Sequence, residues 1–552
     1  MSAQAQGSNQ PIIILKEGSG RTRGRTAQRN NIAAAKILGE VLKSTLGPRG
    51  MDKMLVDNLG DVTVTNDGAT ILKDIDVQHP AAKMMVEASK TQDSIAGDGT
   101  TTVTILISEL LKKAEDLLDQ NIHPTTIVSG YRKAADEALN ILNKIALSVD
   151  ITDRATLSKI AKTSIKSKLV GAAADSFVNV AIDAVSHIAE QRGDKWIADI
   201  SQIQITKKTG GSLIDTKLIK GIIVDKEVSH PGMPKRVEKA KIALIDSPLE
   251  VEKPEMSAEI RIRDPTQMKA FLDEESNMLK GMVDKLKTAG ANVLFCQKGI
   301  DDIALHYLAK ANILAVRRVK KSDMDKLARA TGARMINNLD DITTKDLGIA
   351  EVEEIKIGDD KMVSVEKCRN PKSVGILIRA GLERFVDEAE RAIHDALCVV
   401  ADIYDCNKLV AGGGAVEAEL AKRLRDFASK IGGREQLAIE AFADSLEVIP
   451  KALAENAGLE TIDVIVSLRA AHEKEDGTWQ GVNVFKGKIT DMLKADVVEP
   501  LKVKEQAIKS AVEATLMIMR IDDVIAAAKS RAPMGPPGGM PGGMPGGMPG
   551  MM

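Results

Sequence analysis

The stretch "IAGDGTTTVTILISELL", residues 95–111, places two glycines around an aspartate, directly before three threonines and a periodic apolar run. Glycine lets a backbone approach a ligand closely, and the free amides at a helix start attract anions. Asp98 would repel a phosphate unless a cation lay between them, which makes it a candidate Mg²⁺ ligand. The same loop is also typical of a tight turn before a helix, so this stretch alone leaves both interpretations open.

Two other glycine turns in the chain also lie next to predicted helices. Gly47 and Pro48 end a predicted helix over residues 29–46, and the glycines at 412–414 precede another predicted helix. A segment of different, α/β character lies between the glycine loop at 97–102 and the one at 412–414. A single discontinuous nucleotide-binding domain, made from both ends of the chain with other domains inserted, would explain this order.

Two aspartates outside the glycine loops are candidates for catalysis. Residues 62–68, "VTVTNDG", alternate and then turn, which predicts a hairpin with Asp67 at its tip. Asp395 lies in a long predicted helix over residues 380–405, on a stripe that it shares with Glu388 and Asp402. A solvated helix face would explain this stripe, but an aspartate on a rigid helix could also orient a water for phosphoryl transfer.

Composition and charge exclude several classes of function. The length of 552 residues exceeds what one hydrophobic core serves, which suggests two or three domains. The 76 basic and 78 acidic residues nearly cancel, so we expect neither nucleic acid nor a membrane surface as a partner. We find no secretory signal, no apolar run of membrane-spanning length and no CxxC pair among the cysteines, so we expect a cytoplasmic protein.

Five motifs in register resemble one family. The segments "STLGPRGMDKML", "VTNDGATIL", "QDSIAGDGTTTV", "VAGGGAVE" and "GVNVFKG" follow one another as they do in chaperonins. The spelling "NDGATIL", the irregular segment near 249–280 and the GGM-rich tail resemble the group II form, the archaeal thermosome related to the eukaryotic cytosolic chaperonin. In group I chaperonins the lid is a separate protein, whereas this resemblance implies a lid built into the chain.

The resemblance implies a multi-domain fold with a mainly α-helical equatorial domain, an α/β (α+β) intermediate domain and an α/β apical domain with a helical lid protrusion. The implied equatorial ATP-binding domain consists of 1–150 and 406–552, with 533–552 as a flexible GGM tail. The implied intermediate hinge domain consists of 151–221 and 374–405. The implied apical substrate-binding domain is 222–373, with its lid at 249–280.

The resemblance also implies the residues of an ATP site. Asp98 would bind Mg²⁺, while Asp67 and Asp395 would position and activate the hydrolytic water. The expected nucleotide-binding residues are Leu46, Gly47, Pro48, Gly68, Gly97, Asp98, Gly99, Thr100, Thr101, Thr102, Lys168, Gly413, Gly414, Asn483, Val484, Phe485 and Glu499. Among these, Asn483, Val484 and Phe485 would flank the base, and Glu499 would meet the ribose. Lys168 matches the nucleotide-sensing loop, although Lys166 is an alternative for that role.

The implied function is that of an ATP-driven folding chamber. The cofactors are ATP and Mg²⁺, with K⁺ as a possible third, and the partners are unfolded client proteins and identical or paralogous subunits in stacked rings of eight. Apolar lid residues at Ile260, Met268, Phe271 and Leu272 would contact clients or neighbouring lids, unless Phe271 and Leu272 pack into the apical core. Two rival interpretations are a ring scaffold with a decayed nucleotide pocket and a small-molecule kinase.

Overall fold

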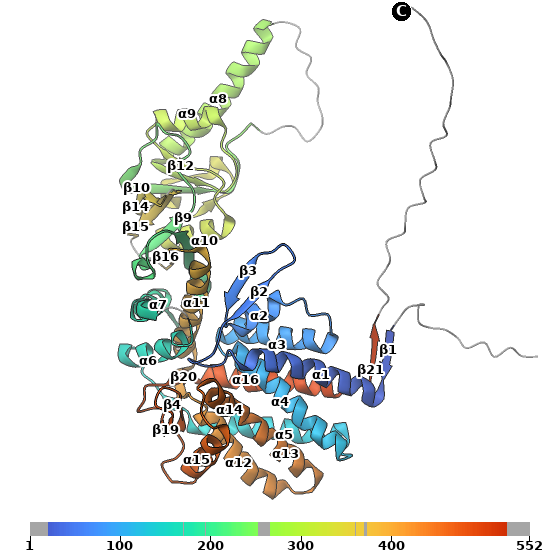
Figure 1. Cartoon of the computed structure of the whole chain (residues 1–552). Coiled ribbons are helices and arrows are strands. Elements are labelled where there is room, and N and C mark those ends of the chain that lie inside the picture. Colours follow the sequence, from blue (N-terminus) through green and yellow to red (C-terminus); the bar gives the residue numbers. More distant parts are fainter. Residues whose placement is uncertain are drawn as a thin grey trace, which may run out of the picture.

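The computed structural model describes residues 20–168, 171–193, 195–251, 265–358, 360–368 and 372–526. These residues form three packed regions that follow one another along one long axis, and a helix projects from one end (Figure 1). The lower region in Figure 1 contains both ends of the described chain, while the upper region comes from its middle.

The lower region is a bundle of helices from the two ends of the chain. Its helices are α1 (Gly24–Lys43), α2 (Gly68–Asp74), α3 (Pro80–Ala96), α4 (Thr100–Asp119), α5 (Pro124–Ile145), α12 (Ala415–Ile431), α13 (Gly433–Leu446), α14 (Val448–Asn456), α15 (Thr461–His472) and α16 (Leu501–Met519). One apolar core joins them, and helices α4 and α5 pack there against α13 and α16.

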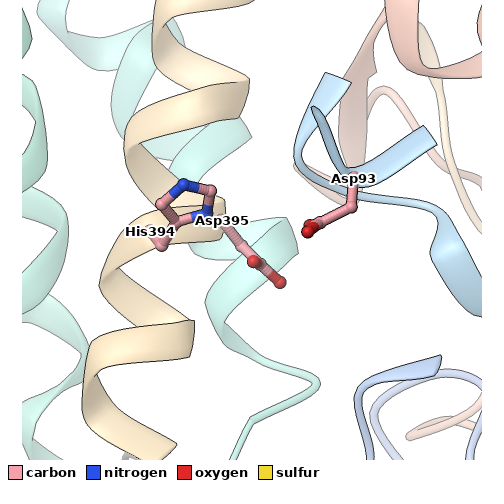
Figure 2. Close-up of side chains that lie close together, drawn as sticks. All are labelled: Asp93, His394 and Asp395. Atoms are coloured by element: carbon pink, nitrogen blue, oxygen red, sulfur yellow. The ribbon is translucent and has the colours of Figure 1, made fainter. Parts of the chain in front are cut away.

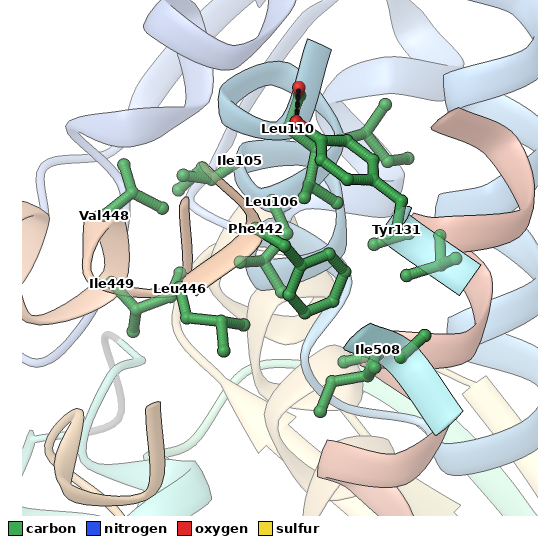
Figure 3. Close-up of a cluster of buried hydrophobic side chains, with 14 of the residues drawn as sticks. Ile105, Leu106, Leu110, Tyr131, Phe442, Leu446, Val448, Ile449 and Ile508 are labelled. Atoms are coloured by element: carbon green, nitrogen blue, oxygen red, sulfur yellow. Dashed lines mark hydrogen bonds between the residues drawn. The ribbon is translucent and has the colours of Figure 1, made fainter. Parts of the chain in front are cut away.

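Aromatic side chains lie at the centre of this lower core (Figure 3). The ring of Phe442 on α13 meets the ring of Tyr131 on α5 edge to face, with centroids 5.7 Å apart. The hydroxyl of Tyr131 donates a hydrogen bond to the carbonyl oxygen of Leu110 on α4, at 2.9 Å. These contacts connect helices from the first and last thirds of the sequence.

Removal of the Phe442 ring is expected to destabilise this region strongly. Phe442 is 1% exposed, and a buried phenylalanine replaced by alanine typically costs about 3–5 kcal/mol through lost transfer energy and the cavity left behind. Phe442→Ala should therefore lower the midpoint of guanidinium chloride unfolding. Phe385→Ala is the matched control because Phe385 is 45% exposed. Equal midpoints for the two variants would contradict the packing of Phe442 in the core of the lower region (Figure 3).

Short strands complete the lower region. The two ends of the described part of the chain pair as β1 (Gly20–Arg23) with β21 (Asp523–Ala526), and a hairpin joins β2 (Lys53–Val56) to β3 (Val62–Thr65). The remaining strands are β4 (Leu147–Ser148), β17 (Lys408–Ala411) and β20 (Val498–Pro500) in one sheet, and β18 (Gln480–Asn483) with β19 (Lys488–Asp491) in another.

The predicted position of Asp67 at a hairpin tip is wrong. The hairpin turns earlier, between β2 and β3, and Asp67 stands between β3 and α2 as the N-cap of that helix. Its carboxylate accepts a hydrogen bond from the backbone amide of Thr70 at 2.9 Å. Aspartate favours both turns and helix starts, and the apolar residues after Gly68 bury one face of a short helix.

The middle region combines a small sheet with three longer helices. Its sheet has the order β7 (Ile203–Thr209), β16 (Val374–Ala380) and β8 (Lys217–Ile219), and a separate hairpin joins β5 (Glu190–Arg192) to β6 (Lys195–Ile197). The helices are α6 (Arg154–Ile165), α7 (Ala174–Ile188) and α11 (Glu383–Cys406). Helix α11 packs on α6 and α7 through one face and reaches α3 and α16 of the lower region.

The acidic stripe of α11 is not a solvated face. Glu388, Asp395 and Asp402 are only 4%, 7% and 3% exposed. The stripe is buried because α11 is covered from two sides, by the helices of its own region and by elements of the lower region. The interpretation of this stripe as a solvated face is therefore wrong. The sequence alone does not reveal that elements of the lower region cover α11.

The upper region is built on a seven-stranded mixed sheet. Its order is β12 (Leu314–Val316), β11 (Val293–Cys296), β10 (Arg236–Ile245), β14 (Gly348–Ile357), β15 (Asp360–Glu366) and β9 (Gly221–Val224), and β13 (Met335–Ile336) pairs with β10. Helices α8 (Pro265–Ala289), α9 (Asp302–Lys310) and α10 (Lys321–Thr331) accompany it. Apolar clusters lie on both faces of the sheet.

Helix α8 begins in the projection at the end of the molecule and runs into the upper core (Figure 1). Leu279, Val283 and Leu286 near its end are buried. Phe271 and Leu272 are 51% and 54% exposed, so the alternative that they pack into the core is wrong. Met268 belongs to this helix, and Ile260 lies outside the described residues.

Candidate functional site

A cavity of about 240 Å³ lies at the start of helix α4, between the lower region and the end of α6 in the middle region. It is lined by residues from distant parts of the chain. Those expected from the sequence are Leu46, Gly47, Pro48, Asp67, Asp98, Gly99, Thr100, Thr101, Thr102, Lys166, Lys168, Gly413, Gly414, Asn483, Val484, Phe485 and Glu499. Gly68, Gly97 and Asp395 are not among the lining residues.

The start of α4 presents backbone amides and hydroxyls to the cavity. Gly99 is left-handed, with φ of 83°, and the first helical hydrogen bond runs from the Val103 amide to its carbonyl oxygen. The amides of the three threonines therefore precede the helical ladder, where amides are free to bind an anion. The carbonyl oxygen of Asp98 accepts a hydrogen bond from Gln92 Nε2 at 2.7 Å, which fixes the loop from behind.

Asp67 is connected to this helix start through a hydroxyl. Thr100 Oγ1 donates to Asp67 Oδ1 at 3.0 Å, and Thr70 donates to Oδ2. Burial alone would raise the pKa of the Asp67 carboxyl, but the Lys168 ammonium and the hydrogen bonds from Thr70 and Thr100 lower it below its ordinary value. Asp67 is therefore an ionised carboxylate at neutral pH.

Lys168 joins the cavity to helix α11. Its Nζ lies 3.2 Å from Asp395 Oδ2, and both side chains are almost completely buried. Burial lowers the pKa of Lys168, but the carboxylates of Asp395 and Asp67 raise it by more, so the ammonium keeps its charge. Burial, opposed by Lys168, raises the pKa of Asp395 well above its ordinary value. Lys166 lines the same cavity, but its side chain is exposed.

Gly68 and Gly97 allow close packing behind the cavity. A Cβ at Gly68 would lie 2.8 Å from the backbone nitrogen of Thr101, and a Cβ at Gly97 would collide with Cys398 on α11. Gly97 is also left-handed, with φ of 64°. Both glycines shape the helix start, and a side chain at either position would push it away from its neighbours.

Two sets of residues could hold a metal ion within the part of the chain that the structure describes. Asp98 lines the cavity beside the threonine hydroxyls, and such oxygen donors are the ligands that Mg²⁺ prefers. The second set is Asp93 of α3 with His394 and Asp395 of α11, whose donor atoms all lie within 4.8 Å of one another (Figure 2). An imidazole suits Mg²⁺ poorly, and Asp395 already pairs with Lys168, so Asp98 fits Mg²⁺ better.

The opposite end of the cavity is formed by the β18–β19 turn. Asn483 Oδ1 accepts hydrogen bonds from the amides of Phe485 and Lys486, at 3.2 and 3.1 Å, which fixes the turn. The ring of Phe485 is 61% exposed at the cavity mouth, and the guanidinium of Arg49 lies 5.7 Å from its centroid. An exposed apolar ring beside a cavity can stack on a flat ligand group.

Several residues at this site were missed from the sequence. They are Asp93, His394, Thr163, Glu417 and Lys504. Asp93 directly follows Gln92 in one of the quoted motifs, which is the one signal that could have drawn attention to it. Glu417 ends the quoted motif "VAGGGAVE", whereas Thr163, His394 and Lys504 lie in ordinary helical stretches, where a single polar residue carries no local signature.

Among the described helices, none is long and apolar enough to cross a lipid bilayer.

Comparison with known proteins gives consistent results over nearly the whole chain. Residues 38–529 match the model of the TCP-1/cpn60 chaperonin family. The chain is 60% identical to the thermosome subunit beta of Sulfurisphaera tokodaii over 526 residues, which is 95% of each chain. It is 58% identical to the thermosome subunit alpha of Archaeoglobus fulgidus, over 95% of this chain and 96% of that protein. It is also 58% identical to a thermosome subunit of Pyrococcus abyssi, with the same coverage.

Proposed function

The chain belongs to the TCP-1/cpn60 chaperonin family and is a group II chaperonin, and on this premise we propose that its cavity binds and hydrolyses ATP with Mg²⁺ to drive protein folding. The observation that carries this proposal is that four side chains lie together around the start of α4: Asp67, Asp98, Lys168 and Asp395. An anion-binding helix start, a carboxylate for a cation and further carboxylates for a water are the parts that phosphoryl transfer to water requires.

Each part has a distinct task in this proposal. The amides and hydroxyls of Thr100, Thr101 and Thr102 bind the phosphate oxygens, and Asp98 holds Mg²⁺. The metal, when bound, neutralises charge on the phosphates. Asp67 and Asp395 orient a water toward the terminal phosphorus, and the water's proton passes to a carboxylate as the bond to the leaving phosphate oxygen breaks. Phe485 and its neighbours hold the base, and Glu499 the ribose.

We propose the three domains with the boundaries predicted from the sequence. Three features support them: one apolar core unites residues near both chain ends, a second unites α6, α7 and α11, and two more cover the sheet of the upper region. Asp395 then belongs to the intermediate domain, and the cavity lies between that domain and the equatorial domain, because Thr163 and Lys168 line it together with the glycine loops. Movement of α11 would therefore couple hydrolysis to domain rotation, with Gly210 and Gly211, both at positive φ, as hinge residues.

Clients are proposed to bind at the upper region. Exposed apolar residues such as Phe271 and Leu272 on α8 can bury the apolar surface of an unfolded chain or of a neighbouring lid. From the family resemblance we carry over stacked rings of eight identical or paralogous subunits, a lid without a separate co-chaperonin, K⁺ as a further ion and a cytoplasmic location.

The choice between Lys168 and Lys166 can be tested by two methionine variants. Lys168→Met should lower ATP turnover at least about tenfold, because it removes the buried ammonium beside Asp395. Lys166→Met should change turnover less than about threefold, because an exposed charge is well solvated. The measurement is steady-state phosphate release at saturating ATP. A larger loss in Lys166→Met would assign the sensing role to Lys166.

The proposed function is tested by phosphate release with and without Mg²⁺, combined with negative-stain electron microscopy of the purified protein. We expect Mg²⁺-dependent turnover by double-ring particles. Rings without turnover would instead indicate a scaffold whose nucleotide pocket has decayed. Turnover by monomers or dimers would favour a small-molecule kinase.

A further inference from the structure

A buried lysine lies between two carboxylates at one end of the cavity. Lys504, in the first turn of α16, places its Nζ 2.8 Å from Glu417 Oε1 and 2.8 Å from Glu499 Oε2. Lys504 and Glu499 line the cavity, whereas Glu417 stands behind them at the start of α12. The side chains of Lys504 and Glu417 are 9% and 5% exposed, and that of Glu499 is 25% exposed.

Stability alone is a poor explanation for this group. The removal of three charges from water is expensive, and apolar residues of similar volume commonly stabilise a protein as well or better. Two carboxyl groups also share one ammonium, and Glu417 Oε2 is buried without a hydrogen bond to any described residue. Such an arrangement is better explained by a task at the cavity than by packing.

The geometry leaves one oxygen of Glu499 directed at the glycine loop. Strand β20 pairs with β17, with Glu499 opposite Val410, and this register places the carboxylate beside Gly412. A Cβ on Gly412 would lie 2.6 Å from Glu499 Oε1, so only glycine leaves room for this oxygen. Because Lys504 holds the other oxygen, Oε1 remains as an acceptor beside Gly412, in the loop whose next residues, Gly413 and Gly414, line the cavity.

An ionised carboxylate only accepts hydrogen bonds, so its partner in the ligand must be a donor. In a nucleotide whose phosphates lie at the start of α4, the ribose hydroxyls are the donors next along the molecule. We propose that Lys504, held in place by Glu417, is a positioning residue whose ion pair favours the ionised form of Glu499 and aims its free oxygen at these hydroxyls, so that the cavity selects ribonucleotides. This inference rests on the proposed nucleotide site.

Without Lys504, two carboxylates would meet with no cation between them. Like charges in a low-dielectric site favour protonation or separation of one partner. Glu499 would then either accept a proton or turn away from Glu417. In both cases it would lose its preference for a ligand with ribose hydroxyls.

The test compares the dissociation constants of ADP and 2′,3′-dideoxy-ADP for the full-length protein, by isothermal titration calorimetry with Mg²⁺. For the wild type we expect dideoxy-ADP to bind at least about tenfold more weakly, which is typical of a lost hydrogen bond to a charged group. For Lys504→Met we expect the two constants to agree within about twofold, which corresponds to the loss of that hydrogen bond.

Lys502→Met is the matched control. Lys502 lies half a turn away on α16 and also forms two ion pairs, with Asp402 and Asp405, but it is not among the cavity residues. This variant should keep the wild-type ratio of the two constants. If Lys504→Met does not fold, the double variant Lys504→Met/Glu417→Met replaces the buried pair by apolar side chains. It should also lose the ratio, because no ammonium then holds Glu499 Oε2 in place.

The possible results separate this inference from the function on which it rests. A Lys504 variant that binds both ligands more weakly by the same factor would overturn the inference and indicate that Lys504 contacts the phosphates or only supports the fold. A wild type that does not distinguish the two ligands would also overturn it. A wild type that binds neither ligand would instead contradict the proposed nucleotide site.

Discussion

Asp395→Asn is expected to lower ATP turnover at least about a hundredfold while ADP still binds, because loss of a positioned acid–base group typically costs two to four orders of magnitude. The amide keeps the size of the side chain but cannot accept the proton of the attacking water. Asp395 is not among the residues that line the cavity, so its loss should leave the dissociation constant of ADP nearly unchanged. Phosphate release and calorimetry measure the two quantities separately.

Asp387→Asn serves as the control for this variant. Asp387 lies two turns earlier on α11, is partly exposed and pairs with Lys207. Its replacement removes an acidic charge from the same helix without touching Lys168. If the two variants lost turnover equally, the effect would belong to the helix and not to Asp395. Wild-type turnover in Asp395→Asn would remove this residue from the mechanism.

Asp98→Asn is expected to remove the dependence of nucleotide binding on Mg²⁺. In the wild type, chelation of Mg²⁺ by EDTA should weaken ADP binding at least about tenfold, because a carboxylate facing phosphates is repulsive until a cation lies between them. In the variant, binding with and without Mg²⁺ should agree within about twofold, and turnover should be lost. Calorimetric titrations in Mg²⁺ and in EDTA give this ratio directly.

Asp119→Asn is the control for Asp98 because it lies at the far end of the same helix, where it pairs with Arg29 on the surface. It should respond to Mg²⁺ as the wild type does. Retention of the full Mg²⁺ effect in Asp98→Asn would assign the metal to another carboxylate. The neighbouring set of Asp93, His394 and Asp395 would then be the first to examine.

The parts of the site that depend on local backbone geometry could be predicted from the sequence. Gly47, Gly97, Gly99 and Gly414 all have positive φ, and a glycine just after or just before a helix signals such a turn without knowledge of the fold. For this reason the quoted motifs include most of the cavity lining. The family and the multi-domain architecture also followed from these motifs, and the comparisons confirm the family.

The remaining features depend on surfaces that meet only in the folded chain. Asp67 was misplaced because its side chain could serve a turn or a helix cap, and only the packing of α2 decides between them. The stripe of Glu388, Asp395 and Asp402 looked solvated because its covering elements come from other parts of the chain. Lys504 has no local signature, since its two partners lie on β20 and α12.

The most direct test of the central claim, that ATP hydrolysis at this cavity drives protein folding, is the recovery of a chemically denatured test enzyme. Its regained activity would be measured with the full-length protein and Mg²⁺, in the presence of ATP or ADP. The account predicts a high yield with ATP, little recovery with ADP, and little recovery with ATP when Asp395→Asn replaces the wild type. Equal yields with ATP and ADP, or full recovery with the Asp395 variant, would contradict it.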